Sequence, residues 1–441
     1  MKRFRYQHIF ALLALCFTLG LQSCLKDQAD IFDKASSLRL QEYMDKTQET
    51  LASAPNGWVL DVYPIESQAI GGFAYTLKFD KEKCEVRTMM YKDSVKTSYY
   101  KMTAEVGPAI SFDTYNWLMH YFSNPSFQNI EAFRGDFIFV VDSLSDNLIK
   151  VHGARTKNVM YLRKLEVPAE EYIQNTAAFK TAFTKKELWA FKGNEEGKDF
   201  DAEIDPFTQH ITINNDGQLS TTAIAFTDKG VRTYKPVKIG NSMVDELVFN
   251  QDANNFVAKR NDNTILTCQA EQPTWMKEFF ALKGNYILHA KYKQNGRDYE
   301  AEIDVELNPN SDYTGYTMSG LVKDYEVKPV FDRQTRTSGF LPQFIMTLDN
   351  GIRLAMFSYS KDKGVMGYDK EQINVAWDNE RKNLLFKPTN INGETYTGWI
   401  MVAINSNNQL ALASNYQAAS PYLFGRAFAS LDQLISLERD E

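Results

Sequence analysis

Residues 197–205, which read GKDFDAEID, contain the pattern that decides the fold of this chain. From Asp199 to Asp205 acidic and apolar side chains alternate, and successive side chains of an extended strand point to opposite faces. One face therefore carries only acids, which are Asp199, Asp201, Glu203 and Asp205. The alternation predicts a strand of an antiparallel sheet with one buried face and one solvated face.

The acidic face has two interpretations. A row of carboxylates could bind Ca²⁺ or a basic ligand. It could equally be a solvated face whose charges discourage pairing between sheet edges. Residues 296–304, GRDYEAEID, repeat the pattern with Asp298, Glu300, Glu302 and Asp304. Because the same pattern occurs twice, we interpret both rows as structural.

The two acidic strands belong to a weak internal repeat. It has three echoes in the same order: KELWAFKGN at 186–194 and KEFFALKGN at 277–285, then the acidic strands at 197–205 and 296–304, then Lys-Pro-Val at 235–237 and 328–330. The offsets of 91, 99 and 93 residues predict duplication of a β-rich unit of about 90 residues. The alternative is chance similarity between strand-rich segments.

Strand-like segments dominate the rest of the chain. They lie at 58–63, 73–80, 84–91, 98–106 and 136–142. Helices are predicted at 34–54 and 168–183, with shorter ones after Asp113 and at 430–437, where Ser430 and Gln433 form a capping pair. Hairpin turns are predicted at Asp349-Asn350-Gly351 and Asn392-Gly393. We therefore predict a mainly β fold of antiparallel sheets, sandwich or barrel-like, with an N-terminal helix, a few short peripheral helices and an α+β first domain.

The length of 441 residues is more than one hydrophobic core organises. We expect a leader and a tether followed by three folded parts. The expected boundaries are 1–23 for a signal peptide, 24–33 for a polar tether, 34–183 for the α+β domain, 184–276 for a first β-rich unit, and 277–441 for a second β-rich unit with the C-terminal segment.

The first 24 residues predict export and membrane anchoring. Three basic residues precede an uncharged apolar run from Ile9 to Leu21, which is too short to span a bilayer as a helix. The ending Leu21-Gln22-Ser23-Cys24 is similar to a bacterial lipobox, in which the cysteine becomes the lipid-modified N-terminus. We expect cleavage before Cys24 and attachment to the bilayer through Cys24, in the outer membrane facing the exterior. The alternative is an ordinary secretory signal cut near Ser23.

The composition excludes one class of partner and bounds the cysteine chemistry. Removal of residues 1–23 changes the formal net charge from −7 to −10, because that segment holds three basic residues and no acidic one. A well-mixed acidic chain lacks the basic face that nucleic acid requires, so no nucleic-acid partner is expected.

Beyond Cys24 the chain contains Cys84 and Cys268. We expect two separate buried thiols, with a single disulfide as the alternative.

No motif predicts a catalytic centre, a metal site or a cofactor. The chain lacks a GxSxG elbow, a Walker loop and an HExxH spacing. Its histidines after the leader stand alone in the sequence, at His120, His152, His210 and His289. The carboxylate pair of a glycoside hydrolase has no sequence spacing of its own, so the sequence leaves a hydrolase open.

Aromatic side chains are the remaining candidates for ligand contact, because their rings stack on sugars and peptides. Most of the tryptophans lie in apolar alternation and are predicted core residues. Trp377 precedes Asp378-Asn379-Glu380, whereas Tyr313 and Tyr316 flank Thr314-Gly315. Turns at these places would expose the three rings. Trp377, Tyr313 and Tyr316 are therefore the predicted ligand-binding residues.

Three motifs give the chain a family resemblance. They are APNGW at 54–58, GGFAY at 71–75 and GPAISFDTYN at 107–116. Together with the lipobox and the acidic tether, they resemble the Bacteroidota lipoproteins of domain-of-unknown-function family 4302. The resemblance implies an accessory of an outer-membrane nutrient-uptake system, with a TonB-dependent transporter and its binding lipoprotein as partners. It implies no catalytic residues.

The sequence thus predicts a membrane-anchored surface lipoprotein that binds a ligand or partner in nutrient uptake, in preference to an enzyme. One alternative is an exported hydrolase of glycan or peptide, which requires two carboxyl groups with shifted titration in a cleft. The other is a purely structural component of the transporter assembly, which requires a large apolar surface patch.

Overall fold

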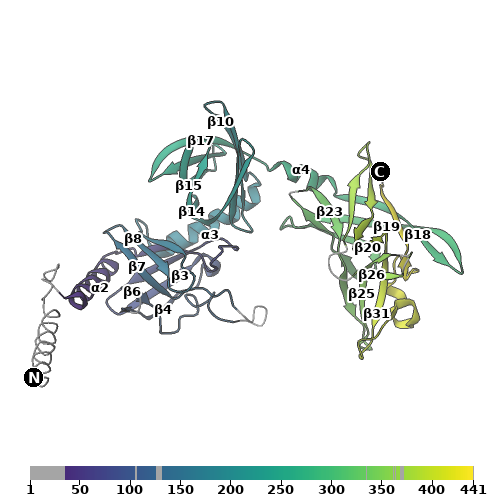
Figure 1. Cartoon of the computed structure of the whole chain (residues 1–441), viewed down its shortest axis with the longest axis horizontal. Helices are drawn as coiled ribbons and strands as arrows, with labels where there is room; N and C mark the ends of the chain where they lie inside the picture. Colours follow the sequence, from purple (N-terminus) through teal and green to yellow (C-terminus); the bar gives the residue numbers. More distant parts are fainter. Residues whose placement is uncertain are drawn as a thin grey trace, which may run out of the picture. The chain divides into compact units, whose positions relative to one another are not determined.

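The computed structural model describes residues 35–440 except 105, 106, 126–131, 334, 361, 363 and 368–371 (Figure 1). Cys24, the predicted signal peptide and the tether lie outside these residues. The chain forms two compact units, and the boundary between them in the sequence lies between Glu271 and Gln272. The expected boundary between residues 183 and 184 falls inside helix α3 (Ala169–Lys186), and the one between 276 and 277 falls inside helix α4 (Thr274–Ala281).

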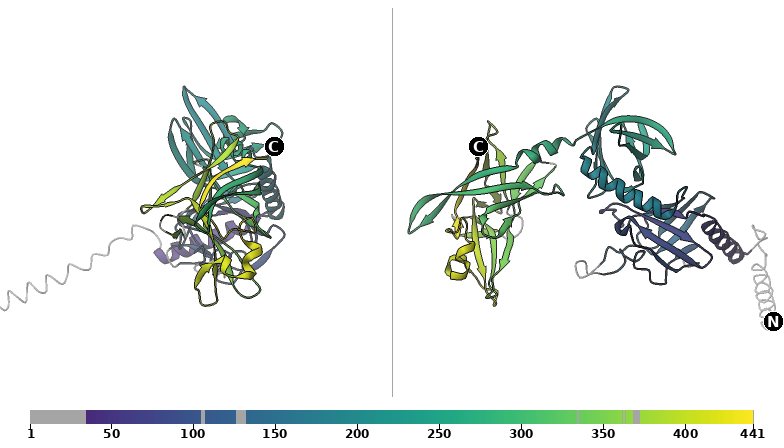
Figure 2. Two further views of the ribbon diagram at one scale, coloured as in Figure 1. Left: turned by 90° about the vertical axis from the view of Figure 1, so that its right-hand side faces the viewer. Right: turned by 180° about the vertical axis from the view of Figure 1, so that it is seen from behind.

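The N-terminal unit begins with an open antiparallel sheet (Figure 2). Among the described residues its strand order is β4-β3-β2-β1-β9-β8-β7-β6-β5. The strands are β1 (Trp58–Val62), β2 (Phe73–Phe79), β3 (Lys83–Thr88), β4 (Lys96–Tyr99), β5 (Lys101–Thr103), β6 (Ala109–Ser111), β7 (Ile138–Leu144), β8 (Leu148–Gly153) and β9 (Val159–Lys164). Helix α2 (Ser36–Ala52) precedes the sheet, as predicted, and the 3₁₀ helix η2 (Met89–Tyr91) follows β3.

The segment after Asp113 does not form the predicted helix, because a buried side chain holds it in a series of turns. Asp113 pairs with Lys101 at 2.5 Å instead of capping a helix. The fully buried Asn116 accepts a hydrogen bond from the backbone N–H of Leu118 at 3.2 Å. Its amide donates to the carbonyl of Lys96 at 3.0 Å, which ties the segment to β4. Tertiary contacts of this kind override helix propensity.

The second half of the N-terminal unit is a closed antiparallel barrel that follows helix α3 (Figures 1 and 2). Its strands are β10 (Ala190–Glu195), β11 (Lys198–Asp205), β12 (His210–Asn215), β13 (Gln218–Phe226), β14 (Gly230–Ile239), β15 (Ser242–Asn250), β16 (Asn255–Arg260) and β17 (Asn263–Glu271). The barrel closes where Phe191 of β10 pairs with Ala270 of β17. The ring of Phe183, from α3, lies 5.3 Å from that of Phe249 and 6.0 Å from that of Phe256, so the helix contributes to the barrel core.

The repeated segments form the same local structure in both units. Each consists of a helix end, a strand and a hairpin that returns through the acidic strand. In the barrel the hairpin is β10–β11, and in the second unit it is the longer β18 (Gly284–Gln294) and β19 (Arg297–Pro309). The third echo differs, because Lys235-Pro236-Val237 lies inside β14 whereas Lys328-Pro329 precedes a new strand. Ala202 and Ile204 are buried while their acidic neighbours face outward, as the alternation predicted.

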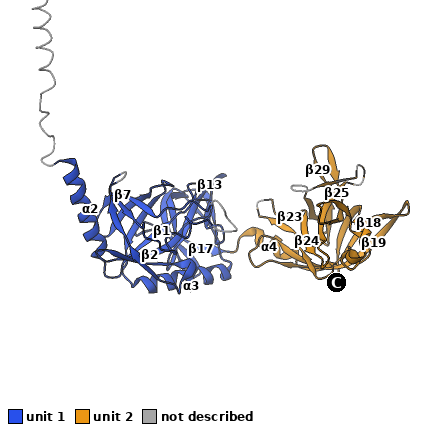
Figure 3. Cartoon of the chain, turned by 90° about the horizontal axis from the view of Figure 1, so that it is seen from below, with its two compact units in different colours: residues 1–271 blue, residues 272–441 orange. Residues whose placement is uncertain are grey.

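Among its described residues the C-terminal unit contains two large antiparallel sheets and a two-stranded one (Figure 3). The first has the order β21-β20-β19-β18-β34-β28-β27-β23-β22, with β20 (Tyr316–Val322), β21 (Tyr325–Val327), β22 (Val330–Asp332), β23 (Thr337–Phe340), β27 (Ile373–Trp377), β28 (Asn383–Lys387) and β34 (Gln433–Arg439). The second joins β24 (Gln343–Thr347), β25 (Arg353–Ser360), β26 (Val365–Gly367), β31 (Gly398–Ile404), β32 (Leu410–Leu412) and β33 (Ser430–Leu431).

The predicted hairpin turns of the C-terminal unit are confirmed, but its predicted terminal helix is wrong. Residues 349–351 connect β24 to β25, and Asn392-Gly393 connects β29 (Thr389–Ile391) to β30 (Glu394–Tyr396). The 3₁₀ helices η3 (Ala413–Asn415) and η4 (Gln417–Tyr422) follow β32. Residues 430–437 form β33 and most of β34, because β34 pairs with β18 on one side and β28 on the other. Two rows of sheet hydrogen bonds outweigh a local capping signal.

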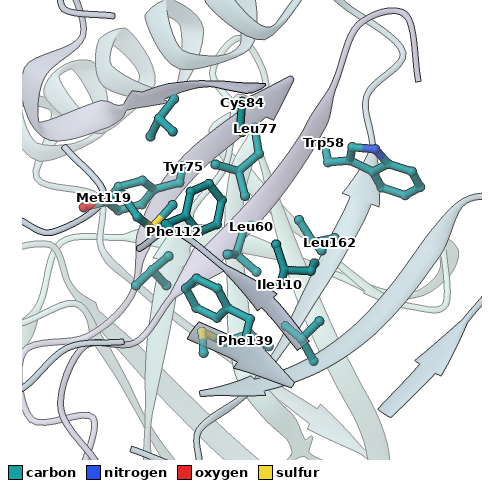
Figure 4. Packing of buried hydrophobic residues seen from close by; sticks show 14 of the residues in the cluster. Trp58, Leu60, Tyr75, Leu77, Cys84, Ile110, Phe112, Met119, Phe139 and Leu162 are labelled. Carbon is teal, nitrogen blue, oxygen red and sulfur yellow. The ribbon is translucent and has the colours of Figure 1, made fainter. Parts of the chain in front are cut away.

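The core of the N-terminal sheet extends into the barrel. Figure 4 shows large side chains gathered between the strands, among them Phe112 and Phe139, whose rings lie edge to face at 6.3 Å. The fully buried Trp58 donates its indole N–H to the carbonyl of Leu51 at 2.9 Å, which fixes α2 on the sheet. Ala225 of the barrel belongs to the same buried cluster. The sheet and the barrel therefore share one core.

Gln209, in the turn between β11 and β12, joins the barrel to the sheet. It is 1 % exposed and adopts a left-handed backbone with φ of 56°. Its side-chain amide donates to the carbonyl of Gly72 at 2.9 Å, and the N–H of Gly72 donates to the carbonyl of Ile224 at 2.9 Å. A Cβ on Gly71 would lie 2.3 Å from the Cβ of Gln209. Glycine is therefore required at 71 for the two backbones to approach.

A buried ion pair forms the second contact across this junction. Nη1 of Arg232, on β14, lies 2.6 Å from Oδ2 of Asp61, on β1, and Nη2 lies 3.7 Å from Oε1 of Glu246. Burial alone lowers the pKa of Arg232, but Asp61, Tyr172 and Glu246 together raise it above its ordinary value. The guanidinium is therefore charged, and it needs these carboxylates in place.

We expect the substitution Asp61→Asn to destabilise the N-terminal unit by about 3 kcal/mol, because it leaves a buried guanidinium without its nearest counter-charge. A loss of this size lowers the melting temperature of a unit of this length by roughly 6–12 °C. Calorimetry of the full chain measures it. Asp228→Asn is the matched control, because Asp228 lies 3.9 Å from the exposed Lys229 and should change stability by less than about 1 kcal/mol. Equal losses in the two variants would contradict the assignment.

Candidate functional site

Tyr313 and Tyr316 lie in the core of the C-terminal unit, so the expectation that a turn exposes them is wrong. Tyr316 is fully buried and donates its hydroxyl to the carbonyl of Phe279 at 2.9 Å. Tyr313 is 8 % exposed, and its ring lies 5.7 Å from that of Phe279. The reason is a bridge between Gly315 and Val330, which draws this segment against α4.

Trp377 is half-buried at the end of β27, and cations already contact its ring. The guanidinium carbons of Arg381 and Arg439 each lie 5.6 Å from the ring centroid. Arg439 also donates to the carbonyl of Ala281 at 2.7 Å. Because cation–π contacts use the ring face on which a ligand would stack, Trp377 acts here as a structural partner of two arginines.

The described residues contain no group of three or more His, Cys, Asp or Glu side chains placed to hold a metal ion. His152 pairs with Asp142 at 2.7 Å, and His289 pairs with Glu438 at 2.8 Å. Cys84 and Cys268 are buried free thiols, and burial raises the pKa of Cys268 to about 11. A thiol with so high a pKa is a poor nucleophile at neutral pH.

A pocket of 540 Å³ lies in the N-terminal unit where η2 and the loop after it meet α3. We call it the Lys180 pocket. Its lining residues are Phe73, Met89, Met90, Tyr91, Lys92, Asp93, Ser94, Ala177, Lys180 and Thr181. They come from the start of β2, from residues 89–94 and from one side of α3. The volume lies within the range of small-molecule sites.

Hydrogen bonds hold the loop side of the pocket in place. Nζ of Lys92 lies 2.9 Å from Oδ1 of Asp93, and the side-chain amide of Gln174, on α3, donates to that same oxygen at 3.0 Å. Gln174 also donates to the carbonyl of Lys92 at 3.1 Å. These bonds from Gln174 and Lys92 lower the pKa of Asp93. The loop is therefore fastened to α3 before any ligand binds.

Lys180 is the charged group on the helix side of the pocket. Its half-buried side chain places Nζ 5.2 Å from the ring centroid of Phe226, on the barrel. Nζ donates to Oε1 of Gln209 at 2.7 Å. Gln209, which joins the barrel to the sheet, thus also holds the ammonium group of Lys180.

Burial lowers the pKa of Lys180 to about 8, although the negative charge of Asp205 raises it in part. An ordinary lysine has a pKa of about 10.4 and is almost fully charged at pH 7. With a pKa of about 8, about a tenth of the Lys180 side chains are neutral at that pH. The lowered pKa reflects a cation that has lost hydration without gaining a carboxylate in contact. Groups of this kind in a cavity are candidates for a functional site.

A cluster of aromatic rings borders the pocket at Tyr91. The ring of Tyr91 lies 5.1 Å from that of Trp117 and 5.5 Å from that of Tyr121, both edge to face. The pKa of Tyr91 is raised mainly by a hydrogen bond with Tyr121 and to a smaller extent by burial. Tyr91 is 38 % exposed and Tyr121 is 37 % exposed. The site therefore offers partly exposed rings beside a pocket of mixed polar and apolar lining, in which Lys92 is paired with Asp93 and Lys180 is not paired with a carboxylate.

Residues 28–251, just over half of the chain, match the family described as a domain of unknown function, DUF4302. The chain belongs to this family. Residues 258–402 of this DUF4302 protein match a second domain of unknown function, DUF4987. No curated protein matches it. A solved structure of a putative 6-phosphogluconolactonase from Bacteroides fragilis NCTC 9343 is similar at 10 % identity over 81 % of each chain, with a TM-score of 0.09. A similarity at that level supports no statement on fold or function.

One motif behind the family resemblance helps to build the Lys180 pocket of this DUF4302 protein. In GGFAY, residues 71–75, Gly71 allows the approach of Gln209, and Phe73 lines the pocket. Lys180 itself was missed. In AAFKTAF, residues 177–183, it has the appearance of one more polar position on an amphipathic helix. Only the burial of that helix between sheet and barrel makes it unusual.

We expect Lys180 to react with acetic anhydride in a pH-dependent manner with a midpoint near 8, because only the neutral amine is acylated and burial lowers the pKa. Competitive labelling followed by peptide mass spectrometry measures the midpoint. Lys185, exposed on the same helix, is the internal control for consumption of the reagent. A midpoint for Lys180 near 10.4, the value of an ordinary lysine, would contradict the prediction.

Proposed function

We propose that this DUF4302 protein is an outer-membrane lipoprotein, anchored through Cys24 and facing the cell exterior, that binds a small organic ligand for a nutrient-uptake system. The observation that carries the proposal is the Lys180 pocket, which combines apolar walls with a half-buried ammonium group. Its loop is held by Gln174 and its cation by Gln209. A preformed pocket binds with little cost in conformational entropy.

The pocket favours binding over hydrolysis. Among its described lining residues Asp93 is the one carboxylate, and it is paired with Lys92. Glycoside hydrolysis by acid and base uses two carboxyl groups about 5–10 Å apart. A single paired carboxylate suits a binding site, in which recognition needs only a few placed polar groups.

The proposed partners are a TonB-dependent transporter and its binding lipoprotein. This part rests on the family resemblance, which is sharpest in residues 24–165, and on the acidic tether after Cys24. A lipoprotein beside a transporter would retain the ligand at the membrane surface until uptake. Crosslinking on intact cells tests the partnership, since recovery of this chain without any transporter would contradict it.

We expect a thermal-shift screen of the chain from residue 25 onward, against oligosaccharides, peptides and organic acids, to find a stabilising ligand. A ligand at about 100 times its Kd stabilises the native state by about 2.7 kcal/mol. Ala177→Trp should abolish the shift, because Ala177 lines the pocket. Ala178→Trp is the matched control, since Ala178 is the exposed neighbour on the same helix. A shift that survives Ala177→Trp would place the ligand elsewhere.

The anchor is tested separately. No helix among the described residues is long and apolar enough to cross a membrane. Two or more acyl chains on Cys24 would give stable attachment to a bilayer. We expect Cys24→Ala to shift the protein from the membrane fraction to the soluble fraction and to abolish incorporation of labelled palmitate. Ser23→Ala, which keeps the cysteine, is the control and should stay with the membrane.

A further inference from the structure

The ammonium group of Lys180 has fewer partners than its charge calls for. It has three N–H donors, and the described residues supply one acceptor, Oε1 of Gln209, and one ring, Phe226. No carboxylate of the described residues forms an ion pair with it. The negative charge of Asp205 acts on it without direct contact, and Oδ1 of Asp205 accepts from the backbone N–H groups of Phe207 and Thr208.

The other charges around the pocket cancel. Lys92 and Asp93 form an ion pair on the loop, and Gln174 donates to Asp93 as well. Thr181, a further polar lining residue, donates its hydroxyl to the carbonyl of Ala177 at 2.9 Å. Lys180 is therefore the cation of the lining that has no paired anion. A ligand cation would meet repulsion here, and beyond the hydroxyl of Ser94 a neutral sugar would find few donors and acceptors that are not already engaged.

Apart from Ser94, the rest of the pocket wall is apolar or aromatic. Phe73, Met89 and Met90 line it beside Tyr91, and methionine side chains adapt to ligands of irregular shape. Phe73 packs on Phe122 at 4.9 Å, which continues the aromatic border. An apolar or aromatic ligand body suits this wall, and an acidic group on that body would supply the missing counter-charge.

We infer that the Lys180 pocket binds an organic anion, whose apolar or aromatic body lies against Phe73, Met89 and Tyr91 and whose acidic group accepts hydrogen bonds from Nζ of Lys180. The inference rests on the proposed function, and it specifies the ligand class of that pocket. A carboxylate, sulfonate or phosphate monoester would satisfy it, because charge-assisted hydrogen bonds form with any of these oxygens.

The test uses 8-anilinonaphthalene-1-sulfonate, a fluorescent aromatic anion, and N-phenyl-1-naphthylamine, its neutral counterpart. Both are titrated into the chain from residue 25 onward, which retains every described residue. We expect Lys180→Met to weaken binding of the sulfonate about ten-fold or more, and to leave binding of the neutral probe within about two-fold. Lys185→Met, on the exposed side of the same helix, should change neither.

A second measurement needs only the unaltered protein. 1-Naphthoate and 1-naphthamide have nearly the same shape and differ in charge. We expect naphthoate to displace the bound sulfonate at a concentration about ten-fold lower than naphthamide does. Equal competition by the two, or equal sulfonate binding by Lys180→Met and the unaltered chain, would overturn the inference. So would a lack of sulfonate binding at millimolar concentration.

Ala177→Trp separates failure of this inference from failure of the proposed function. If charge proves irrelevant but Ala177→Trp removes binding of both probes, the pocket stands and only the ligand class is wrong. If Ala177→Trp leaves both probes bound while Ala178→Trp behaves identically, the pocket itself is not the binding site, and both proposals fall.

Discussion

The N-terminal unit depends on one interaction, the ion pair between the buried guanidinium of Arg232 and the carboxylate of Asp61. A charge removed from water must be met by opposite charge at fixed positions, and here Asp61 comes from the sheet whereas Glu246 comes from the barrel. Because Arg232 and Glu246 both lie on the barrel, the contact with Asp61 is the part of this cluster that orients the barrel on the sheet. Gln209 adds a hydrogen-bonded contact that needs a glycine at 71. Hydrophobic contact alone would hold the two parts together with less control of their orientation.

The Lys180 pocket is a consequence of this junction. Helix α3 contacts the barrel through Phe183 and the loop after η2 through Gln174. Lys180 lies on that helix and contacts Gln209. Its side chain is half-buried because the sheet and the barrel are held in fixed positions on either side of the helix. The contacts that orient the barrel therefore also desolvate the amine of Lys180, a residue that lines the pocket. Residues that stabilise the junction also contribute to the proposed binding site, so we expect changes to the junction to alter both stability and the pocket.

The sequence could predict those structural features that residues adjacent in the chain determine, such as strands and hairpin turns. The alternation in GKDFDAEID identified a half-buried strand, and Asn392-Gly393 identified a hairpin, because both signals are local. Closure of the barrel depends on Phe191 meeting Ala270, which no local pattern indicates. The predicted exposure of Tyr313 and Tyr316 was wrong for the same reason. Tyr316 lies beside a turn in sequence yet is buried by a distant strand, whereas Lys180 has an ordinary sequence context and an unusual environment.

The last strand of the chain lies in the interior of its sheet. β34 separates β18 from β28, so without it the two halves of that sheet have no strand between them. Residues 433–439 must therefore be available before the C-terminal unit can complete its hydrogen bonding. Pairing over such a distance in sequence is slow, because loop closure precedes the gain from contact. For a chain that emerges N-terminus first, the barrel is able to form during synthesis, whereas this sheet is completed only after residues 433–439 have emerged.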